Sequence, residues 1–232
     1  MEAKISQEEI MQLLDRLYKQ SAYGVAKVSP PIEELADDYL RKNRNVDAAA
    51  KQFINYQITK CATSGFVTGL GGLITLPVAI PANVGSVLYV QMRMIACLAY
   101  MGGYDIKSDQ VQTLVYACLA GISIDQIFKQ AGIKVGNKAV MAMVKKIPGE
   151  VLAKINQKVG FRLLTKFGTK GIVNIGKMVP VVGGIISGGF DFAETKVIAN
   201  RAYTMFIDGN FDVLSETDID EIECATDEEI LK

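Results

Sequence analysis

The stretch CATSGFVTGLGGLITLPVAIPANVGSVLYVQM, residues 61–92, contains thirty-two consecutive residues without a charged side chain. A helix that crosses a bilayer needs roughly 20 apolar residues, so length alone would permit a span. Glycines and prolines gather between Gly71 and Pro81, and proline inside a helix costs roughly 3 kcal/mol. The stretch therefore predicts two apolar helices with a Gly/Pro break between them, the second running from about Ala82 to Met101.

Helix signals precede this stretch. Ser6 and Glu9 have the spacing of a capping box, and apolar residues then recur at helical spacing until Gly24. Pro30–Pro31 suits the first turn of a second helix, and Asp47 is predicted to cap a third. We expect three ordinary amphipathic helices before the uncharged stretch.

Helix signals also follow it. Residues 111–124 form a short uncharged run, whose length fits a buried core helix, and a last helix is predicted from about Phe190 to Ile207. Together these patterns predict an all-α, multi-helix bundle without a sheet, in which residues 171–190 form a second Gly/Pro-broken apolar hairpin.

The two apolar hairpins resemble each other. Residues 77–100 align with residues 180–203 at an offset of 103, with seven identities. We interpret this as an internal repeat with halves at about 53–105 and 158–207, although chance similarity between Gly- and Ala-rich helices is the alternative. A repeat of this kind predicts that Arg93 is buried and forms a structural ion pair across the two copies, with Asp191 or Glu194.

Charge is divided unevenly along a chain whose formal net charge is zero. Residues 106–207 carry fourteen basic and five acidic side chains, whereas residues 208–232 carry one basic and ten acidic side chains. This pattern predicts a basic body and an acidic tail at 208–232, and the capping box with its helical spacing sets apart an N-terminal amphipathic helix at 1–24.

The residues that most enzymes depend on are scarce. The sequence has no histidine, its four cysteines form no CxxC pair, and no GxxxxGK[ST] motif occurs. We therefore expect no enzymatic activity, no catalytic residue, no cofactor and no metal. The polar N-terminus lacks an apolar signal segment, so we expect a cytoplasmic protein with reduced thiols.

Three segments carry a resemblance to a known family. They are SGFVTGLGGLITLPVAIPANVGSVLYVQMRMIACLAYMGGYD, SDQVQTLVYACLAG and KVGFRLLTKFGTKG…KMVPVVGGIISGGFDF, and they fall within residues 25–207. Here the chain resembles the EcsC family of bacterial proteins. The resemblance implies a helical domain and a loose association with membranes and export systems, including a membrane complex such as an ABC transporter. It implies no catalytic residue.

Residues 129–170 hold ten Lys/Arg against one acid, which suits an anionic membrane surface, a solvated face or nucleic acid. Few aromatic residues are available for base stacking, so we expect lipid and no nucleic-acid partner. The leading hypothesis is a membrane-associated protein, peripheral or partly embedded at the inner face of the cell membrane. A soluble helical adaptor, a membrane-perforating effector and a lipid carrier are the alternatives. The candidate lipid-binding residues are Lys145, Lys146, Lys166, Lys170, Gly71, Gly72, Pro77, Pro81, Pro180, Gly183 and Gly184.

Overall fold

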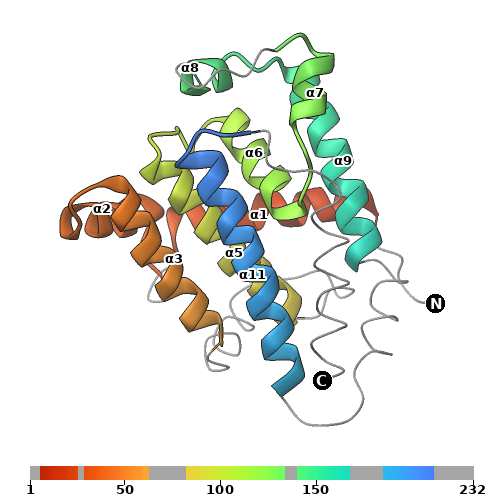
Figure 1. Cartoon of the computed structure of the whole chain (residues 1–232). Helices are drawn as coiled ribbons and strands as arrows, with labels where there is room; N and C mark the ends of the chain where they lie inside the picture. Colours follow the sequence, from red (N-terminus) through yellow and green to blue (C-terminus); the bar gives the residue numbers. More distant parts are fainter. Residues whose placement is uncertain (1–5, 26–28, 63–81, 134–139, 168–184, 212–232) are drawn as a thin grey trace, which may run out of the picture.

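The computed structural model describes residues 6–25, 29–62, 82–133, 140–167 and 185–211 (Figure 1). Within these ranges the chain forms nine helices and no strand, and its one β-type contact is an isolated bridge between Val25 and Ser29. The predicted all-α class is confirmed. The helices are α1 (Gln7–Tyr23), α2 (Ile32–Lys42), α3 (Val46–Ala62), α5 (Ala82–Met101), α6 (Asp109–Ala120), α7 (Asp125–Gln130), α8 (Val140–Val144), α9 (Gly149–Phe167) and α11 (Ile185–Phe206).

The first helix begins and ends where the sequence predicts. The Ser6 hydroxyl accepts a hydrogen bond from the backbone N–H of Glu9 at 3.1 Å, and the Glu9 carboxylate accepts one from the backbone N–H of Ser6 at 2.7 Å. This reciprocal capping box satisfies N–H groups that have no partner inside the helix. Gly24 ends α1 with a φ of 77°, a left-handed value that favours glycine.

The cap of α3 differs from the prediction. The side-chain oxygen of Asn45 accepts a hydrogen bond from the backbone N–H of Ala48 at 2.8 Å, so Asn45 and not Asp47 is the capping residue. Asp47 lies in the first turn, where it pairs with Lys51 at 2.9 Å. Asparagine and aspartate are about equally good caps, and the sequence pattern could not decide between two such residues placed two positions apart.

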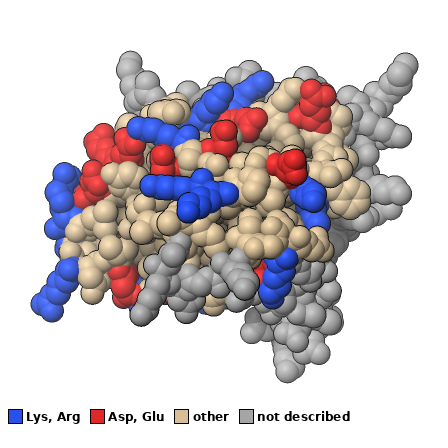
Figure 2. Space-filling view, turned by 90° about the horizontal axis from the view of Figure 1, so that it is seen from above, with Lys and Arg blue, Asp and Glu red and all other residues tan. Residues whose placement is uncertain are grey.

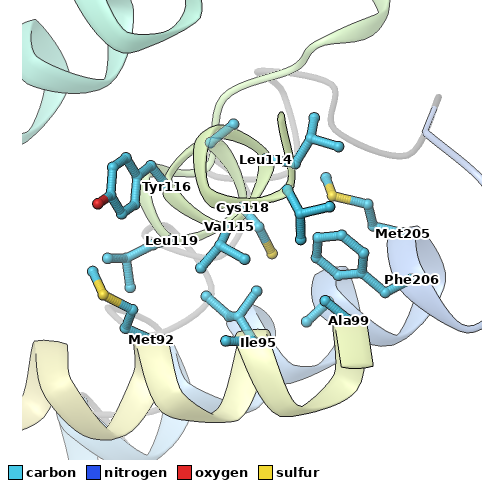
Figure 3. Packing of buried hydrophobic residues seen from close by; sticks show 14 of the residues in the cluster. Met92, Ile95, Ala99, Leu114, Val115, Tyr116, Cys118, Leu119, Met205 and Phe206 are labelled. Carbon is cyan, nitrogen blue, oxygen red and sulfur yellow. The ribbon is translucent and has the colours of Figure 1, made fainter. Parts of the chain in front are cut away.

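Helix α5 lies at the centre of the fold and packs against α1, α2, α3, α6 and α11. Figure 3 shows the contact on one side, where Ile95 and Ala99 of α5 meet Val115 and Cys118 of α6. Phe206 of α11 closes the same cluster. Because almost every residue of α5 from Leu88 to Ala99 is buried, the helix has apolar residues on all its faces, as a helix enclosed by neighbours should.

The end of α5 makes a close approach to the end of α11. A Cβ atom added to Gly102 would lie 2.1 Å from the carbonyl oxygen of Phe206. Only glycine fits there, and the following Gly103 turns the chain with a φ of 84°. The predicted end of this helix at about Met101 is therefore confirmed, and the backbones of two helices far apart in sequence touch at that point.

The Gly/Pro breaks of both predicted hairpins lie outside the described residues, as do Gly71, Gly72, Pro77, Pro81, Pro180, Gly183 and Gly184. The helices that would correspond in the internal repeat, α5 and α11, pack against each other. They share a buried hydrogen bond in which the Gln91 side-chain amide donates to the Thr195 hydroxyl at 3.3 Å. Packing alone does not demonstrate a duplication, so the repeat stays a prediction.

Candidate functional site

Helix α9 is amphipathic and is held to the body by one face. Ile155, Val159 and Leu163 repeat every four residues and are almost completely buried. The helix packs there against α1 and α6, and the Gln7 side chain donates to the backbone carbonyl of Gln157 at 2.9 Å. These contacts fix which side of α9 is turned outward.

The outward side carries cations around one large aromatic ring. Lys154, Lys158 and Phe161 lie at i, i+4 and i+7 and are exposed, and Arg162 beside them is half-buried. The Phe161 side chain is 64 % exposed. We call Lys154, Lys158, Phe161 and Arg162 the α9 outer face.

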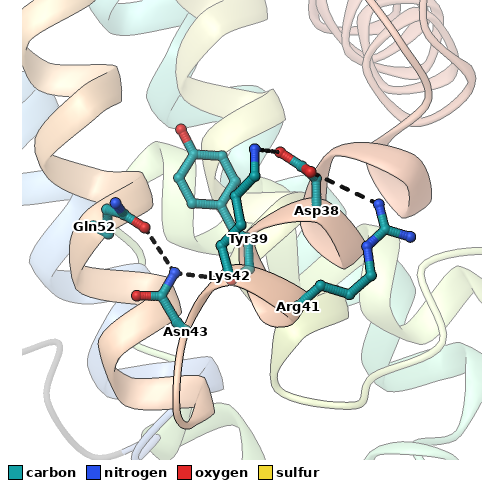
Figure 4. Close-up of polar contacts among 6 residues, drawn as sticks. All are labelled: Asp38, Tyr39, Arg41, Lys42, Asn43 and Gln52. Atoms are coloured by element: carbon teal, nitrogen blue, oxygen red, sulfur yellow. Dashed lines mark hydrogen bonds and ion pairs between the residues drawn. The ribbon is translucent and has the colours of Figure 1, made fainter.

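The cations of this face have no acidic partner within the described ranges of the chain. Glu150, the only acid in α9, lies one turn before Lys154, and the structure forms no ion pair between them. The cations of α2 are different, because Lys42 and Arg41 pair with Asp38 at 2.6 Å and 3.7 Å (Figure 4). The α9 outer face thus offers positive charge that is not neutralised by its described neighbours.

Two of the predicted lipid-binding residues lie next to the start of α9. Lys145 and Lys146 are exposed in the turn between α8 and α9, and neither has an acidic partner in the described part of the chain. The short helix α8 buries Val140 and Val144 and leaves Met141 exposed. We call Lys145 and Lys146 the α8–α9 turn.

The other predicted lysines differ from this pair. Lys166 lies at the end of α9 and forms an ion pair with Glu194 of α11, and Lys170 lies outside the described residues. Figure 2 shows basic and acidic side chains interspersed on the face seen from above. That face as a whole is therefore not uniformly basic.

Sequence reasoning missed Lys154, Lys158 and Phe161. It counted the cations of this segment only within the total for residues 129–170, and the signal it left unused was the i, i+4, i+7 spacing of the three side chains. Phe161 in particular is ambiguous in sequence, because a phenylalanine in an amphipathic helix is normally part of the core.

Arg93 is buried, with 6 % of its surface exposed, and the partners that the structure describes for it are two backbone carbonyls. One terminal nitrogen donates to the carbonyl of Ser21 at 2.7 Å and the other to the carbonyl of Pro30. The predicted ion pair with Glu194 is not formed, because Glu194 pairs with Lys166. The side chain of Asp191 lies outside the described residues. Burial lowers the pKa of Arg93, and the two carbonyl dipoles compensate for lost hydration.

Arg93 thus serves as a clamp on the connection between α1 and α2. Its two carbonyl partners flank that connection, and the Tyr89 hydroxyl shares a 2.7 Å hydrogen bond with the Ser29 hydroxyl in the same place. The arrangement ties a loop to α5 by polar contacts and assigns Arg93 a structural role.

Reactive side chains are not brought together in the described part of the molecule. Burial raises the pKa of the Cys118 thiol to about 12 and raises that of Cys97 as well, which removes the thiolate that a cysteine nucleophile requires. The Tyr116 hydroxyl donates to Asp15 at 2.7 Å, joining α6 to α1. Within the described ranges, no group of His, Cys, Asp and Glu side chains could hold a metal ion.

The comparison with protein families decides the affiliation of the chain. The model of the EcsC protein family matches residues 3–206. The chain belongs to the EcsC family. The match begins at residue 3 and so includes α1, which the three segments quoted from the sequence did not.

The EcsC match ends just before the acidic tail. No curated protein and no solved structure matches this chain. Among the helices described here, none combines the length and the apolar character needed to cross a bilayer. The family assignment does not state an activity, so the functional conclusion rests on the surface of the molecule.

Proposed function

We propose that this EcsC-family protein binds the anionic surface of a lipid bilayer peripherally, through the α9 outer face and the adjoining α8–α9 turn. The observation that carries the proposal is the exposed Phe161 ring among cations that have no acidic partner in the described part of the chain. At a membrane interface Lys/Arg side chains attract anionic headgroups, and an apolar side chain such as Phe enters the boundary between headgroups and acyl chains.

The basic side chains would attract the protein to the anionic surface, and the Phe161 ring would insert among the lipid chains. Each basic residue near an anionic leaflet contributes about 1 kcal/mol, and the effect fades within a Debye length of about 8–10 Å. From Lys154 to Arg162 the outer face extends about 12 Å along the helix axis, so its charges can contact several headgroups together. Burial of the Phe161 ring among lipid chains adds an apolar contribution that salt does not screen.

The rigid attachment of α9 favours a peripheral contact. Its inner face is part of the core, so the helix can present its outer face without leaving the fold. The inner leaflet of the cell membrane is the proposed location, and a membrane protein complex such as an ABC transporter is the proposed neighbour there.

Flotation with vesicles tests the proposal. The full chain is mixed with vesicles of phosphatidylcholine alone or of phosphatidylcholine with phosphatidylglycerol, at low and high salt. We expect it to float best with the anionic vesicles at low salt, more weakly with them at high salt, and not with phosphatidylcholine alone. The variant Lys154→Gln/Lys158→Gln should lose about 2 kcal/mol of binding, roughly a thirty-fold fall in partitioning. Phe161→Ala should weaken binding at both salt concentrations.

The matched control is Arg41→Gln/Lys42→Gln. It removes the same charge from α2, on the side of the molecule opposite α9 (Figure 1), and should float like the unchanged chain. Equal losses in both double variants would show that net charge alone is responsible. If the unchanged chain stays at the bottom of the gradient with every vesicle, the membrane proposal is wrong and a soluble adaptor becomes the better reading.

A further inference from the structure

The described part of the chain ends at Phe211, whose position is fixed by packing. Phe211, the last described residue, is 1 % exposed and packs against Phe128 of α7, with ring centroids 6.3 Å apart. Just before it, the backbone N–H of Asn210 donates to the carbonyl of Thr204 at 3.0 Å. Residues 212–232 therefore start from an anchored position.

This exit point lies beside the elements that carry the unpaired cations. Helix α7 packs against α9, so Phe211 is one helix away from α9. Gly209 approaches α8 as well: a Cβ atom added there would lie 3.8 Å from the Val140 side chain. The α8–α9 turn follows α8 directly in sequence.

Charge and length both fit an intramolecular contact. Residues 212–232 contain nine acidic side chains and one lysine, and five described cations nearby have no acidic partner: Lys145, Lys146, Lys154, Lys158 and Arg162. Twenty-one residues can span up to about 70 Å when extended, whereas the nineteen residues of α9 extend about 28 Å. The segment is therefore long enough to reach any part of the α9 outer face.

We propose that the acidic segment 212–232 binds the α9 outer face and the α8–α9 turn within the same molecule, and that it competes there with anionic lipid. The second half of this inference rests on the proposed membrane function, whereas the first half does not. A single surface ion pair is weak, but a tethered segment acts at an effective concentration of millimolar order, so several weak pairs together suffice. Salt should release the segment because the pairs are exposed.

The intramolecular contact is tested without lipid. A carbodiimide joins a carboxylate to a lysine amine that touches it, and peptide mapping of the cross-linked full chain identifies the pair. We expect products between residues 212–232 and Lys154, Lys158 or the α8–α9 turn, and their loss at high salt. Lys42 on the far side of the molecule is the internal control. The inference would be overturned if residues 212–232 cross-linked equally to all exposed lysines, Lys42 included. It would also be overturned if they cross-linked to no lysine.

The competition is tested by neutralising part of the segment in the full chain. The variant Asp220→Asn/Glu221→Gln/Glu223→Gln should give fewer of these cross-links and bind anionic vesicles several-fold more tightly. The control Glu33→Gln/Glu34→Gln/Asp109→Asn makes the same change in net charge on the folded body and should leave both measurements unchanged. Equal gains in vesicle binding by the two variants would overturn the competition.

The two proposals fail in distinguishable ways. Cross-links at the predicted lysines with no vesicle binding by any variant would support the intramolecular contact and refute the proposed membrane function. The opposite result is vesicle binding that depends on Lys154 and Lys158, without these cross-links and without a change when the segment is neutralised. It would support the membrane function and refute the intramolecular contact.

Discussion

At the scale of single residues, Arg93 shows which structural features can be predicted from the sequence and which cannot. A lone cation between Met92 and Met94 in an apolar helix predicts burial and a need for partners. The partners themselves are carbonyl oxygens at Ser21 and Pro30. No local pattern encodes them, because they depend on how the connection after α1 returns to α5 in three dimensions.

Replacing this arginine should destabilise the fold strongly. Arg93→Met leaves two carbonyl groups without their donors, and each buried unsatisfied group costs about 1–3 kcal/mol, so we expect a loss of about 3 kcal/mol in the free energy of unfolding. Arg93→Lys can keep one of the two contacts and should lose about half as much. Urea denaturation followed by circular dichroism measures both.

Arg41→Met provides the comparison, because Arg41 is exposed and its pair with Asp38 is long at 3.7 Å. We expect a change within about 0.5 kcal/mol. A similar loss for Arg41→Met and Arg93→Met would contradict the role of Arg93 as a clamp.

At the scale of helices, boundaries were predictable where one clear local signal is present, whereas the two candidates Asn45 and Asp47 left the cap of α3 undecided. The Ser6–Glu9 capping box starts α1, and Gly24 and Gly102 follow the last residues of α1 and α5. The outward orientation of α9 was not predictable. Which face of an amphipathic helix is covered depends on neighbours such as α1 and α6, and an exposed Phe161 breaks the usual rule that links apolar character to burial.

Two glycines at helix ends should respond oppositely to alanine. In Gly102→Ala the new methyl group collides with the carbonyl of Phe206, only 2.1 Å away, and the backbones must separate. We expect a loss of about 2 kcal/mol or more. At Gly149, the first residue of α9, a Cβ atom meets nothing within 4 Å, so Gly149→Ala should gain about 0.5 kcal/mol.

Thermal unfolding of the two variants beside the unchanged chain measures this difference. A stabilised Gly102→Ala variant would show that α5 and α11 do not meet closely there, and would call into question the packing of the centre of the fold.

At the scale of the whole molecule, α1 is part of the same hydrophobic core as the rest of the domain. Its residues Ile10, Leu13, Leu14, Leu17 and Tyr18 are buried against the other helices, and α1 packs on both α5 and α9. The sequence treated residues 1–24 as a segment of their own because the family resemblance was visible only after it. The apolar pattern of an amphipathic helix does not indicate which other helices will pack against it.

Removal of residues 1–24 should therefore abolish folding. Each buried large side chain contributes about 1.5–3 kcal/mol, so the five in α1 match the 5–15 kcal/mol by which a domain is typically stable, as an order of magnitude. We expect the shortened chain to lose its cooperative thermal transition by circular dichroism and to aggregate in size-exclusion chromatography. A shortened chain that remains helical, monomeric and cooperative would show that α1 is dispensable.

The central place of α5 also has a consequence during synthesis on the ribosome. The Arg93 side chain that secures the connection after Ser21 is made seventy-two residues later, which at about 5–20 residues per second is a delay of roughly 4–14 s. For that interval the nascent first three helices have no central helix to cover their apolar faces. The N-terminal quarter of this protein is thus the portion for which an early-acting chaperone matters most.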